Sequence, residues 1–373
     1  MKWAFWMAAA TIGYAYVGYA AWLWVRSRWA PHPVRRGTVE PAVSAVMVVR
    51  NEEAVIARKL ENLLTLDYPP EKMEVVVVCD GSNDGTAAIL KEFGANARVR
   101  TLLKPEPQGK ALGLNDAIKL ARGEILLFTD ARQEIEPAAL RLLVENFADP
   151  AVGCVSGELM LGDPASGETG KGMGLYWRVE KKIRELESAS GSVAGATGAL
   201  YCARRDLLEP LPEGTILDDV LLPMQVVRKG ARVVFDSRAR AWDSPDLGES
   251  REFSRKVRTL SGNYQLLQLA PWLLSSRNPI RFEFVSHKLS RLIVPFALVA
   301  LLVASFFLPQ PWYRAALAAQ LAFYALSVVA MVGVRIGPLS RVADAARTFV
   351  VLNSAALVAF VNFVTGRKAV WVR

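Results

Sequence analysis

The chain has 373 residues, of which 52% are hydrophobic, and it carries ten tryptophans and a formal net charge of +9. This length allows one or two domains with a sizeable core, and the hydrophobic content is typical of a membrane protein. The basic balance fits a nucleic acid, anionic lipid or a membrane topology signal equally well. Three widely spaced cysteines form neither a disulfide framework nor a zinc pattern, and two histidines argue against histidine-based catalysis.

The first predicted element is an apolar helix at the N-terminus. Residues 3–25 carry no charged side chain, and a helix of that length extends roughly 35 Å, enough to cross a bilayer. A cleaved signal peptide would have a shorter apolar core and a small-residue cleavage site, whereas this run continues through Trp22 and Trp24 into Arg26. We therefore predict an uncleaved transmembrane anchor over residues 1–26.

Residues 37–285 alternate between two sequence patterns. Short apolar runs typical of buried strands alternate with segments of helical periodicity; the runs are 43–49, 73–79 and 124–129, and the helical segments are 52–65, 84–93, 109–121 and 136–147. This alternation predicts an α/β domain with a parallel sheet covered by helices on both faces. We expect its last part, about 255–285, to be an amphipathic segment at the membrane surface.

Three further uncharged runs follow at 292–308, 315–334 and 348–366. They predict transmembrane or interfacial helices over residues 290–366. The last run contains Asn353, Ser354 and Asn362, which makes it the least secure span.

Basic residues predict the orientation of these helices. Four arginines follow the first run, against Lys2 before it; they are Arg26, Arg28, Arg35 and Arg36. The positive-inside rule then places residues 37–285 in the cytosol. Three later spans would leave the basic tail 367–373 outside, so either the rule fails there or one run lies along the interface, the run 348–366 being the first suspect.

Polar residues stand where each predicted strand ends. The first run is followed by Arg50-Asn51-Glu52-Glu53, the second by Asp80-Gly81-Ser82-Asn83-Asp84, and the third by Asp130. Because ligands of open α/β sheets bind beyond the carboxyl ends of the strands, three acidic strand ends indicate one site. Each also has a purely local interpretation, since Asn51 or Asp84 could cap a helix and the DGSNDG stretch could form a turn.

The order and spacing of these segments resemble the family-2 glycosyltransferases of the GT-A fold, a Rossmann-like α/β fold. That family transfers a sugar from a nucleotide donor with inversion. The resemblance covers residues 43 to about 270 and rests on RNEE (50–53), CDGSNDGTAAI (79–89), GKALGLNDA (109–117), Asp130-Ala131-Arg132 with Pro137 and Leu140, GATGALYCARRDLL (195–208), and Asp218-Asp219 with Leu222 and Arg228-Lys229-Gly230.

The resemblance implies a role for each matching residue. Asp219 would be the base that activates the acceptor hydroxyl, and Asp130 would bind Mg²⁺ or Mn²⁺. The implied donor-binding residues are Asn51, Glu52, Asp80, Ser82, Asp84, Lys110, Asp130, Arg132 and Arg258, and the implied acceptor-side residues are Asp218, Gly198 and Arg204. The pair Asp218-Asp219 has a second interpretation, because acidic residues also stabilise a helix N-terminus.

The resemblance also implies the partners and the location. The donor would be a nucleotide-sugar, UDP-linked, and the acceptor a lipid or lipid-linked glycan, with no nucleic acid involved. The protein would sit in a bacterial plasma membrane with its catalytic domain in the cytosol. The sequence carries no signal for an oligomeric state.

Two departures from the family pattern bear on function. Arg132 replaces the second aspartate of the Asp-x-Asp metal motif, so either one carboxylate and the donor diphosphate hold the ion, or the guanidinium pairs with the diphosphate and partly replaces its charge. Arg255-Lys256-Val257-Arg258-Thr259 stands where polymerising synthases carry Gln-x-x-Arg-Trp. The missing tryptophan favours single-sugar transfer; a processive synthase and a degenerate nucleotide-sugar-binding scaffold are the alternatives.

Overall fold

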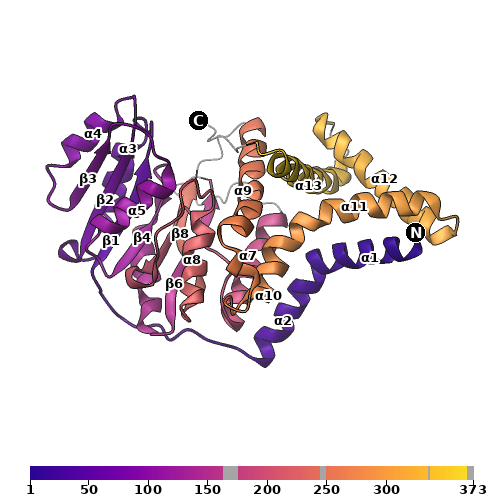
Figure 1. The fold of residues 1–373 in the computed structure, drawn as a ribbon, viewed down its shortest axis with the longest axis horizontal. Helices are drawn as coiled ribbons and strands as arrows, with labels where there is room; N and C mark the ends of the chain where they lie inside the picture. The colour runs from indigo at the N-terminus through magenta and orange to yellow at the C-terminus, as the bar shows by residue number, and fades with distance from the viewer. Residues whose placement is uncertain (163–174, 244–248, 335–336, 368–373) are drawn as a thin grey trace.

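The computed structural model describes residues 1–162, 175–243, 249–334 and 337–367. The α/β part and a set of long helices lie at opposite ends of the molecule (Figure 1). Two segments of the predicted domain 37–285 lie outside the described ranges, residues 163–174 and 244–248. Residues 335–336 and the tail 368–373, with its basic residues, also lie outside them.

The described ranges contain one sheet of eight strands in the order β3-β2-β1-β4-β7-β6-β8-β5. The strands are β1 (Val43–Val49), β2 (Met73–Asp80), β3 (Val99–Lys104), β4 (Ile125–Phe128), β5 (Glu134–Ile135), β6 (Val152–Leu161), β7 (Tyr201–Arg204) and β8 (Arg232–Asp243). Strands β1 to β4 are parallel. The sequence predicts β1, β2 and β4, whereas β3 is not among the predicted strands. The rest of the sheet is mixed, because β7 runs antiparallel to both β4 and β6.

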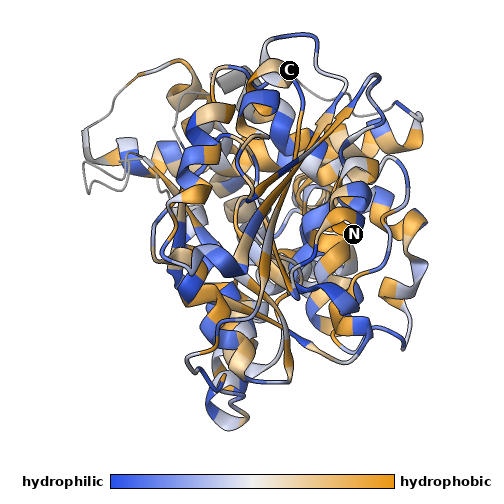
Figure 2. Ribbon diagram, turned by 90° about the vertical axis from the view of Figure 1, so that its left-hand side faces the viewer, coloured by the Kyte–Doolittle hydropathy of each residue, from blue (hydrophilic) through white to orange (hydrophobic). Residues whose placement is uncertain are grey.

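Helices cover both faces of this sheet, which explains why its strands read as continuous apolar runs. On one face Met47 and Val77 pack with α3 (Ile56–Leu64), α4 (Thr86–Phe93) and α6 (Ala139–Val144). On the other, Val46 and Val76 pack with α5 (Lys110–Leu120) and α8 (Asp218–Arg228). Figure 2 shows the strands largely in the colour of hydrophobic residues, between these two layers.

Close packing of α5 on β1 sets the position of the site. A Cβ atom added at Gly113 would lie 2.7 Å from Val48 Cγ1, so only glycine lets the helix approach the strand this closely. Because α5 begins at Lys110, this contact also places the Lys110 side chain beside the carboxyl ends of β1 and β4.

The remaining elements lie outside the sheet layers or connect them. The long helices are α1 (Lys2–Gly13), α2 (Tyr19–Trp29), α7 (Leu175–Ser190), α9 (Glu249–Leu269), α11 (Ser290–Phe307), α12 (Pro311–Met331) and α13 (Ser340–Val364). The short elements are η1 (Tyr14–Gly18), η2 (Pro70–Lys72), η3 (Glu145–Ala148), η5 (Arg205–Leu207), η6 (Pro271–Leu274), α10 (Arg281–Phe284), η7 (Val285–Leu289) and η8 (Gly337–Leu339).

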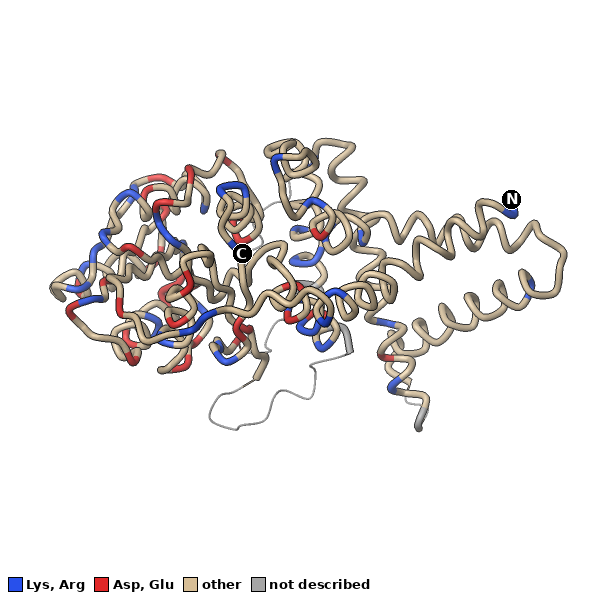
Figure 3. The backbone as a smooth tube through the Cα atoms, turned by 90° about the horizontal axis from the view of Figure 1, so that it is seen from below, with Lys and Arg blue, Asp and Glu red and all other residues tan. Residues whose placement is uncertain are grey.

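Three helical stretches among the described residues are long and apolar enough to cross a membrane: Arg281–Phe307, Pro311–Met331 and Ser340–Val364. They correspond to the three C-terminal runs predicted from the sequence, and they support a membrane protein. Figure 3 shows charged residues gathered over the α/β part and its junction, with only isolated ones along the far ends of α1, α11 and α12.

The N-terminal helix is not among these three stretches, so its role as an anchor stays a prediction. It continues from α1 through η1 into α2 and runs beside α11 (Figure 1). Phe5 packs edge-on against Tyr313 of α12, with ring centroids 4.6 Å apart, and Arg26 at the other end pairs with Glu283. These contacts fix the helix against the C-terminal helices at both of its ends.

Helix α13 packs on α9 rather than standing alone. Ala355 and Ala359 contact Val257, and the ring of Tyr264 stacks on Phe363 at 5.2 Å. Figure 1 shows α13 foreshortened beside α9, whereas α1 and α11 run across the view. This arrangement fits the alternative in which residues 348–366 lie along the membrane surface rather than across it, and that alternative remains a prediction.

Candidate active site

The three polar strand ends meet at one edge of the sheet. Strand β1 pairs in parallel with β2 on one side and β4 on the other, so Asn51, Asp80 and Asp130 all follow carboxyl ends of adjacent strands. The structure therefore brings these three segments together, and their sharing one site stays a prediction.

Asn51 and Ser82 join the loops after β1 and β2. The backbone N–H of Asn51 donates to Ser82 Oγ at 3.0 Å, and Asn51 Oδ1 accepts from the N–H of Asn83 at 2.9 Å. Asn51 has a φ of +56°, a left-handed conformation that asparagine tolerates better than most residues. These two hydrogen bonds stabilise that conformation.

Asp84 links the same loops and also caps a helix. Its Oδ1 accepts from the N–H of Thr86, the first residue of α4, at 3.0 Å, and its Oδ2 accepts from the N–H of Glu53 at 3.2 Å. The local capping interpretation of Asp84 is thus realised. The loops after β1 and β2 are thus held together by hydrogen bonds of Asn51, Ser82 and Asp84.

Asp80 holds the loop that leads into α5. Its two carboxylate oxygens accept from the backbone N–H groups of Gln108 and Gly109, each at 2.8 Å. A Cβ at Gly81, where φ is +63°, would lie 2.4 Å from Pro107 N, so this crossing of two loops requires glycine. The buried Asp80 thereby fixes the backbone immediately before Lys110.

Lys110 is the central cation of the site. Its Nζ lies 3.0 Å from Asp130 Oδ1 after β4 and 3.3 Å from Asp218 Oδ2 at the start of α8. Burial alone would lower the pKa of Lys110, but the carboxylates of Asp130 and Asp218 raise it above its usual range. For Asp130, partial burial acts to raise the pKa. The positive charge of Lys110 has the larger effect, so the pKa of Asp130 is lowered from its usual value.

Asp219 stands next to this ion pair with a different electrostatic balance. Burial and the neighbouring Asp218 raise the pKa of Asp219 to about 6, although Lys110 and Lys288 act in the opposite direction. A Cβ at Gly198 would lie 3.2 Å from Asp219 Oδ2. The glycine therefore leaves room for the carboxylate, and the structure brings the predicted residues Gly198, Asp218 and Asp219 together.

The chain matches a known protein family over its first strands and helices. Residues 44–211 match the family described as Glycosyl transferase family 2. This segment belongs to glycosyltransferase family 2.

Two relatives of this family-2 domain have named activities. The beta-monoglucosyldiacylglycerol synthase of Trichormus variabilis is 29% identical over 192 residues, which is 50% of this chain and 41% of that protein. The poly-beta-1,6-N-acetyl-D-glucosamine synthase of Staphylococcus epidermidis is 24% identical over 235 residues, 62% of this chain and 56% of that protein. The chain thus spans about half the length of these relatives.

A solved structure supports the fold across nearly the whole chain. It is a mannosyltransferase from Pyrobaculum calidifontis in complex with GDP-Man and Mn²⁺, with a TM-score of 0.73 and 22% identity, covering 98% of this chain and 100% of that one. The GT-A fold class predicted from the sequence is confirmed.

Arg132, in the second position of the family's metal motif, turns toward the end of β8. Its Nη2 lies 3.8 Å from Asp243 Oδ2, and its side chain is 39% exposed. Burial raises the pKa of Glu52 and Asp130 adds to this, while Arg132 lowers it. The guanidinium of Arg132 and the carboxylate of Asp130 therefore both lie close enough to Glu52 to influence its charge.

The fit of a metal ion depends on the donor. No cluster of three or more His, Cys, Asp or Glu side chains that could hold a metal occurs within the described ranges. Asp130 offers one carboxylate, already bonded to Lys110. An ion here would need oxygens from the donor itself as further ligands.

Lys59 is a residue of the site region that the sequence analysis did not identify. Its side chain is fully buried in α3 below the turn after β4, and Nζ donates to the backbone oxygen of Gln133 at 2.7 Å. Burial lowers the pKa of Lys59 to about 7, although the charge of Asp130 acts against this. The sequence does carry a signal for this burial: Lys59 is spaced from Ile56 and Leu63 so that it lies on the apolar side of the helix.

Arg204 and Arg258 take different places. Arg258 on α9 is close enough to contribute to the lowered pKa of Asp130. Arg204 instead pairs in register with Ile125, at the start of β4, and donates to the backbone oxygens of Val152 and Phe147. It therefore lies at the opposite end of the strand from Asp130, a position that does not fit the acceptor-side role implied by the resemblance.

Proposed function

We propose that the protein is a membrane-anchored inverting glycosyltransferase. It moves a sugar from a nucleotide-sugar, UDP-linked as the resemblance implies, to a lipid or lipid-linked glycan at the cytosolic membrane face. The proposed organisation is an anchor over 1–26, a GT-A domain over 37–285 and membrane-associated helices over 290–366. The observation that carries this proposal is the ion-paired Lys110 beside Asp219 at the strand-end edge of a family-2 domain.

Asp219 is the proposed base. The acceptor hydroxyl gives its proton to the Asp219 carboxylate, its oxygen bonds to the anomeric carbon, and the bond from that carbon to the diphosphate oxygen breaks. Asp219 is suited to this step because its pKa is raised to about 6, which strengthens it as a base while leaving it ionised at neutral pH.

Basic residues would stabilise the departing diphosphate. Lys110 and Arg258 act on Asp130, and Arg132 acts on the nearby Glu52. Fixed positive charges at a leaving group lower the barrier. When Mg²⁺ or Mn²⁺ is bound, Asp130 and the diphosphate would hold it, and it would add further charge stabilisation. Glu52 and Asp80 lie at the end of the site where the resemblance places the base and ribose.

The membrane helices support an acceptor that resides in or on the bilayer. Two relatives are named as synthases of a glycolipid and of a polysaccharide, and three helices are long and apolar enough to cross a membrane. Thr259, exposed on α9 beside Arg258, offers no aromatic platform for a growing polymer. We therefore propose single-sugar transfer, with a processive synthase as the alternative.

Replacing the proposed base tests the assignment directly. We expect Asp219→Asn to lower kcat for sugar transfer by roughly 10²- to 10⁴-fold, because an amide accepts no proton from the acceptor. Donor affinity should be retained. The measurements are turnover in a nucleotide-sugar screen with detergent-purified protein, and donor binding by calorimetry.

The exposed Asp206, replaced by Asn, serves as the control and should behave as wild type. Full turnover by Asp219→Asn would exclude this base. A folded wild-type protein that hydrolyses none of the donors would overturn the proposed function, and donor binding without turnover would favour the scaffold alternative.

The pH profile tests the electrostatic coupling between Lys110 and Asp219. Since Asp219 acts deprotonated, kcat should fall as the pH drops through about 6. Lys110 lowers the pKa of Asp219, so Lys110→Met should raise it and move the inflection to higher pH, by on the order of one unit. The profile should be recorded at saturating donor, with the exposed Lys119→Met as control; an unmoved or acid-shifted inflection would contradict the coupling.

Because Arg132 replaces the second aspartate of the metal motif, we expect turnover to depend only weakly on a metal ion. Chelation by EDTA should reduce wild-type turnover without abolishing it, because the guanidinium supplies part of the missing charge. Arg132→Asp, which restores the family motif, should make turnover depend absolutely on Mg²⁺ or Mn²⁺. An absolute Mn²⁺ requirement of the wild type would show that Arg132 does not play this part.

Product length separates single transfer from polymerisation. After incubation with the donor sugar and membrane lipid, a sizing gel should show one short, uniform product, because α9 lacks the tryptophan platform. Long products formed from a single enzyme encounter would instead establish the processive synthase.

A further inference from the structure

Glu180 of α7 contacts three basic side chains. Arg184 Nε, one helical turn further along α7, donates to Glu180 Oε1 at 3.3 Å. His287 Nε2 lies 3.1 Å from the same oxygen, and Arg291 Nη2 lies 2.7 Å from Glu180 Oε2. His287 belongs to η7 and Arg291 to α11, so this carboxylate joins the α/β domain to the first of the three long apolar stretches.

The Glu180 carboxylate is buried in its charged form. Its side chain is 8% exposed. Burial acts to raise the pKa of Glu180, but the charges of Arg291 and His287 have the larger effect and hold that pKa well below its usual range. Neutralising Glu180 would leave buried basic groups without their acid, which is unfavourable. The ion pairs of Glu180 therefore fix these side chains relative to one another.

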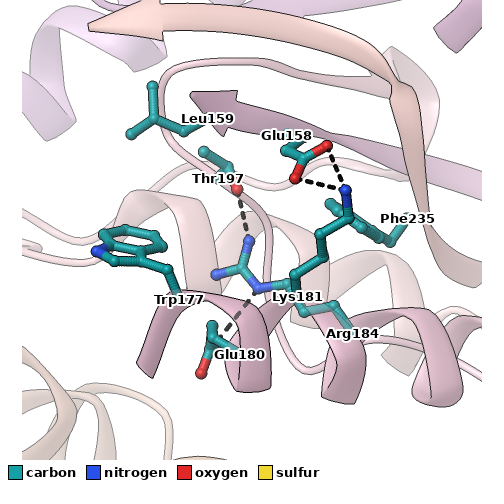
Figure 4. Close-up of a pocket in the computed structure, with 8 residues that line it drawn as sticks. All are labelled: Glu158, Leu159, Trp177, Glu180, Lys181, Arg184, Thr197 and Phe235. Atoms are coloured by element: carbon teal, nitrogen blue, oxygen red, sulfur yellow. Dashed lines mark hydrogen bonds and ion pairs between the residues drawn. The ribbon is translucent and has the colours of Figure 1, made fainter. Parts of the chain in front are cut away.

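Arg184 extends the network to Thr197. Its Nη1 donates to Thr197 Oγ1 at 2.5 Å, and its guanidinium lies between Glu180 and Thr197 (Figure 4). The backbone N–H of Thr197 donates to Ser156 Oγ of β6 at 2.9 Å. Thr197 is thus held through its side chain by α7 and through its backbone by the sheet.

The residues on either side of Thr197 contact Asp219. The N–H of Ala196 donates to the backbone oxygen of Asp219 at 2.7 Å, and a Cβ at Gly198 would lie 3.2 Å from Asp219 Oδ2. The segment 195–198 therefore contacts both the backbone and the carboxylate of the proposed base. A displacement of a reacting group by about 1 Å costs on the order of 10²-fold in rate, so the position of Thr197 matters for the transfer step.

The N-terminal helix joins the same network. Tyr19 Oη donates to Glu187 Oε1 at 2.6 Å, and His287 Nδ1 lies 2.9 Å from that oxygen. Tyr19 also packs on Ile183 of α7. A path of direct contacts therefore runs from the N-terminal helix and from the start of α11, through α7, to the proposed base.

We propose that Glu180 is a positioning residue for the transfer step, which holds Thr197 through Arg184 and thereby fixes the place of Asp219. The proposal rests on the proposed function, in which Asp219 is the base, and it adds a residue that itself contacts no substrate. Because the same carboxylate contacts His287 and Arg291, the placement of the base also depends on how the start of α11 packs against α7.

Paired variants of Thr197 test this route. Thr197→Val removes the hydroxyl that accepts from Arg184 and keeps a similar shape, whereas Thr197→Ser keeps the hydroxyl. We expect Thr197→Val to lower kcat roughly tenfold at an unchanged KM for the donor, and Thr197→Ser to stay near wild type. Glu180→Gln should lower kcat at least as much. Glu185→Gln is the matched control, since it removes an acid of the same helix that pairs at 3.0 Å with the exposed Lys182.

The double variant separates positioning from a general weakening of the fold. If Glu180 acts through Thr197, Glu180→Gln combined with Thr197→Val should have the kcat of Glu180→Gln alone, because both changes interrupt one path. Losses that multiply, or a Thr197→Val variant with unchanged kcat, would overturn the proposal. If Glu180→Gln does not fold, the comparison of Thr197→Val with Thr197→Ser still decides it.

Amide hydrogen exchange provides a measurement that requires no turnover. Exchange of the Ala196 N–H, which bonds to Asp219, should become faster in Thr197→Val but not in Thr197→Ser or Glu185→Gln, at unchanged thermal unfolding. Equal exchange in Thr197→Val and wild type would refute the positioning of Asp219. If the exchange changed as expected while the wild type used no donor, the proposed function alone would be refuted and the hold of α7 on Asp219 would stand.

Discussion

The ammonium group of Lys110 between two carboxylates is the interaction on which the site depends. Asp130 comes from the end of β4 and Asp218 from the start of α8, so without a cation between them two like charges would face each other. Lys110 itself is placed by two separate devices, the Gly113 contact with β1 and the Asp80 hydrogen bonds to the preceding loop. The sheet, the glycine and the loop therefore all serve to position one charge.

This charge also distinguishes the roles of two adjacent acids. The carboxylate of Asp218 pairs with Lys110. Asp219, one residue later, faces Gly198 and has a raised pKa. Successive residues at a helix start point in different directions, so one can be structural while its neighbour remains chemically available. A single dipeptide thus provides both the proposed base and a carboxylate that pairs with Lys110.

The sequence predicts the parallel half of the sheet well and the remainder poorly. Strands β1, β2 and β4 appear as uninterrupted apolar runs because both faces are covered, and their acidic ends converge as a direct consequence of parallel pairing. The antiparallel placement of β7 depends on pairing between residues far apart in the chain, which no local pattern encodes. The resemblance alone implies an acceptor-side role for Arg204, whereas the direction of β7 places Arg204 at the opposite end of β4 from Asp130.

The site residues show the same division. Asp130 could be selected because an acid at a strand end is visible in the sequence, and Asp218 and Asp219 because their spacing resembles that of the family. The loop-holding bonds of Asp80 and the buried position of Lys59 follow from tertiary contacts. In Lys59 the helical spacing was a usable signal, but a lysine is so seldom fully buried that composition argues against it.

Helix α9 connects the candidate active site to helix α13, one of the three helices that are long and apolar enough to cross a membrane. One side of this single helix brings Arg258 near Asp130, and the other packs against α13 through Val257 and Tyr264. A rigid helix passes displacement along its length, so a change in lateral pressure or lipid chain length that shifted α13 would also shift the Arg258 charge near Asp130. For the proposed glycosyltransferase, turnover rates in detergent micelles and in bilayers of different thickness are therefore not interchangeable quantities.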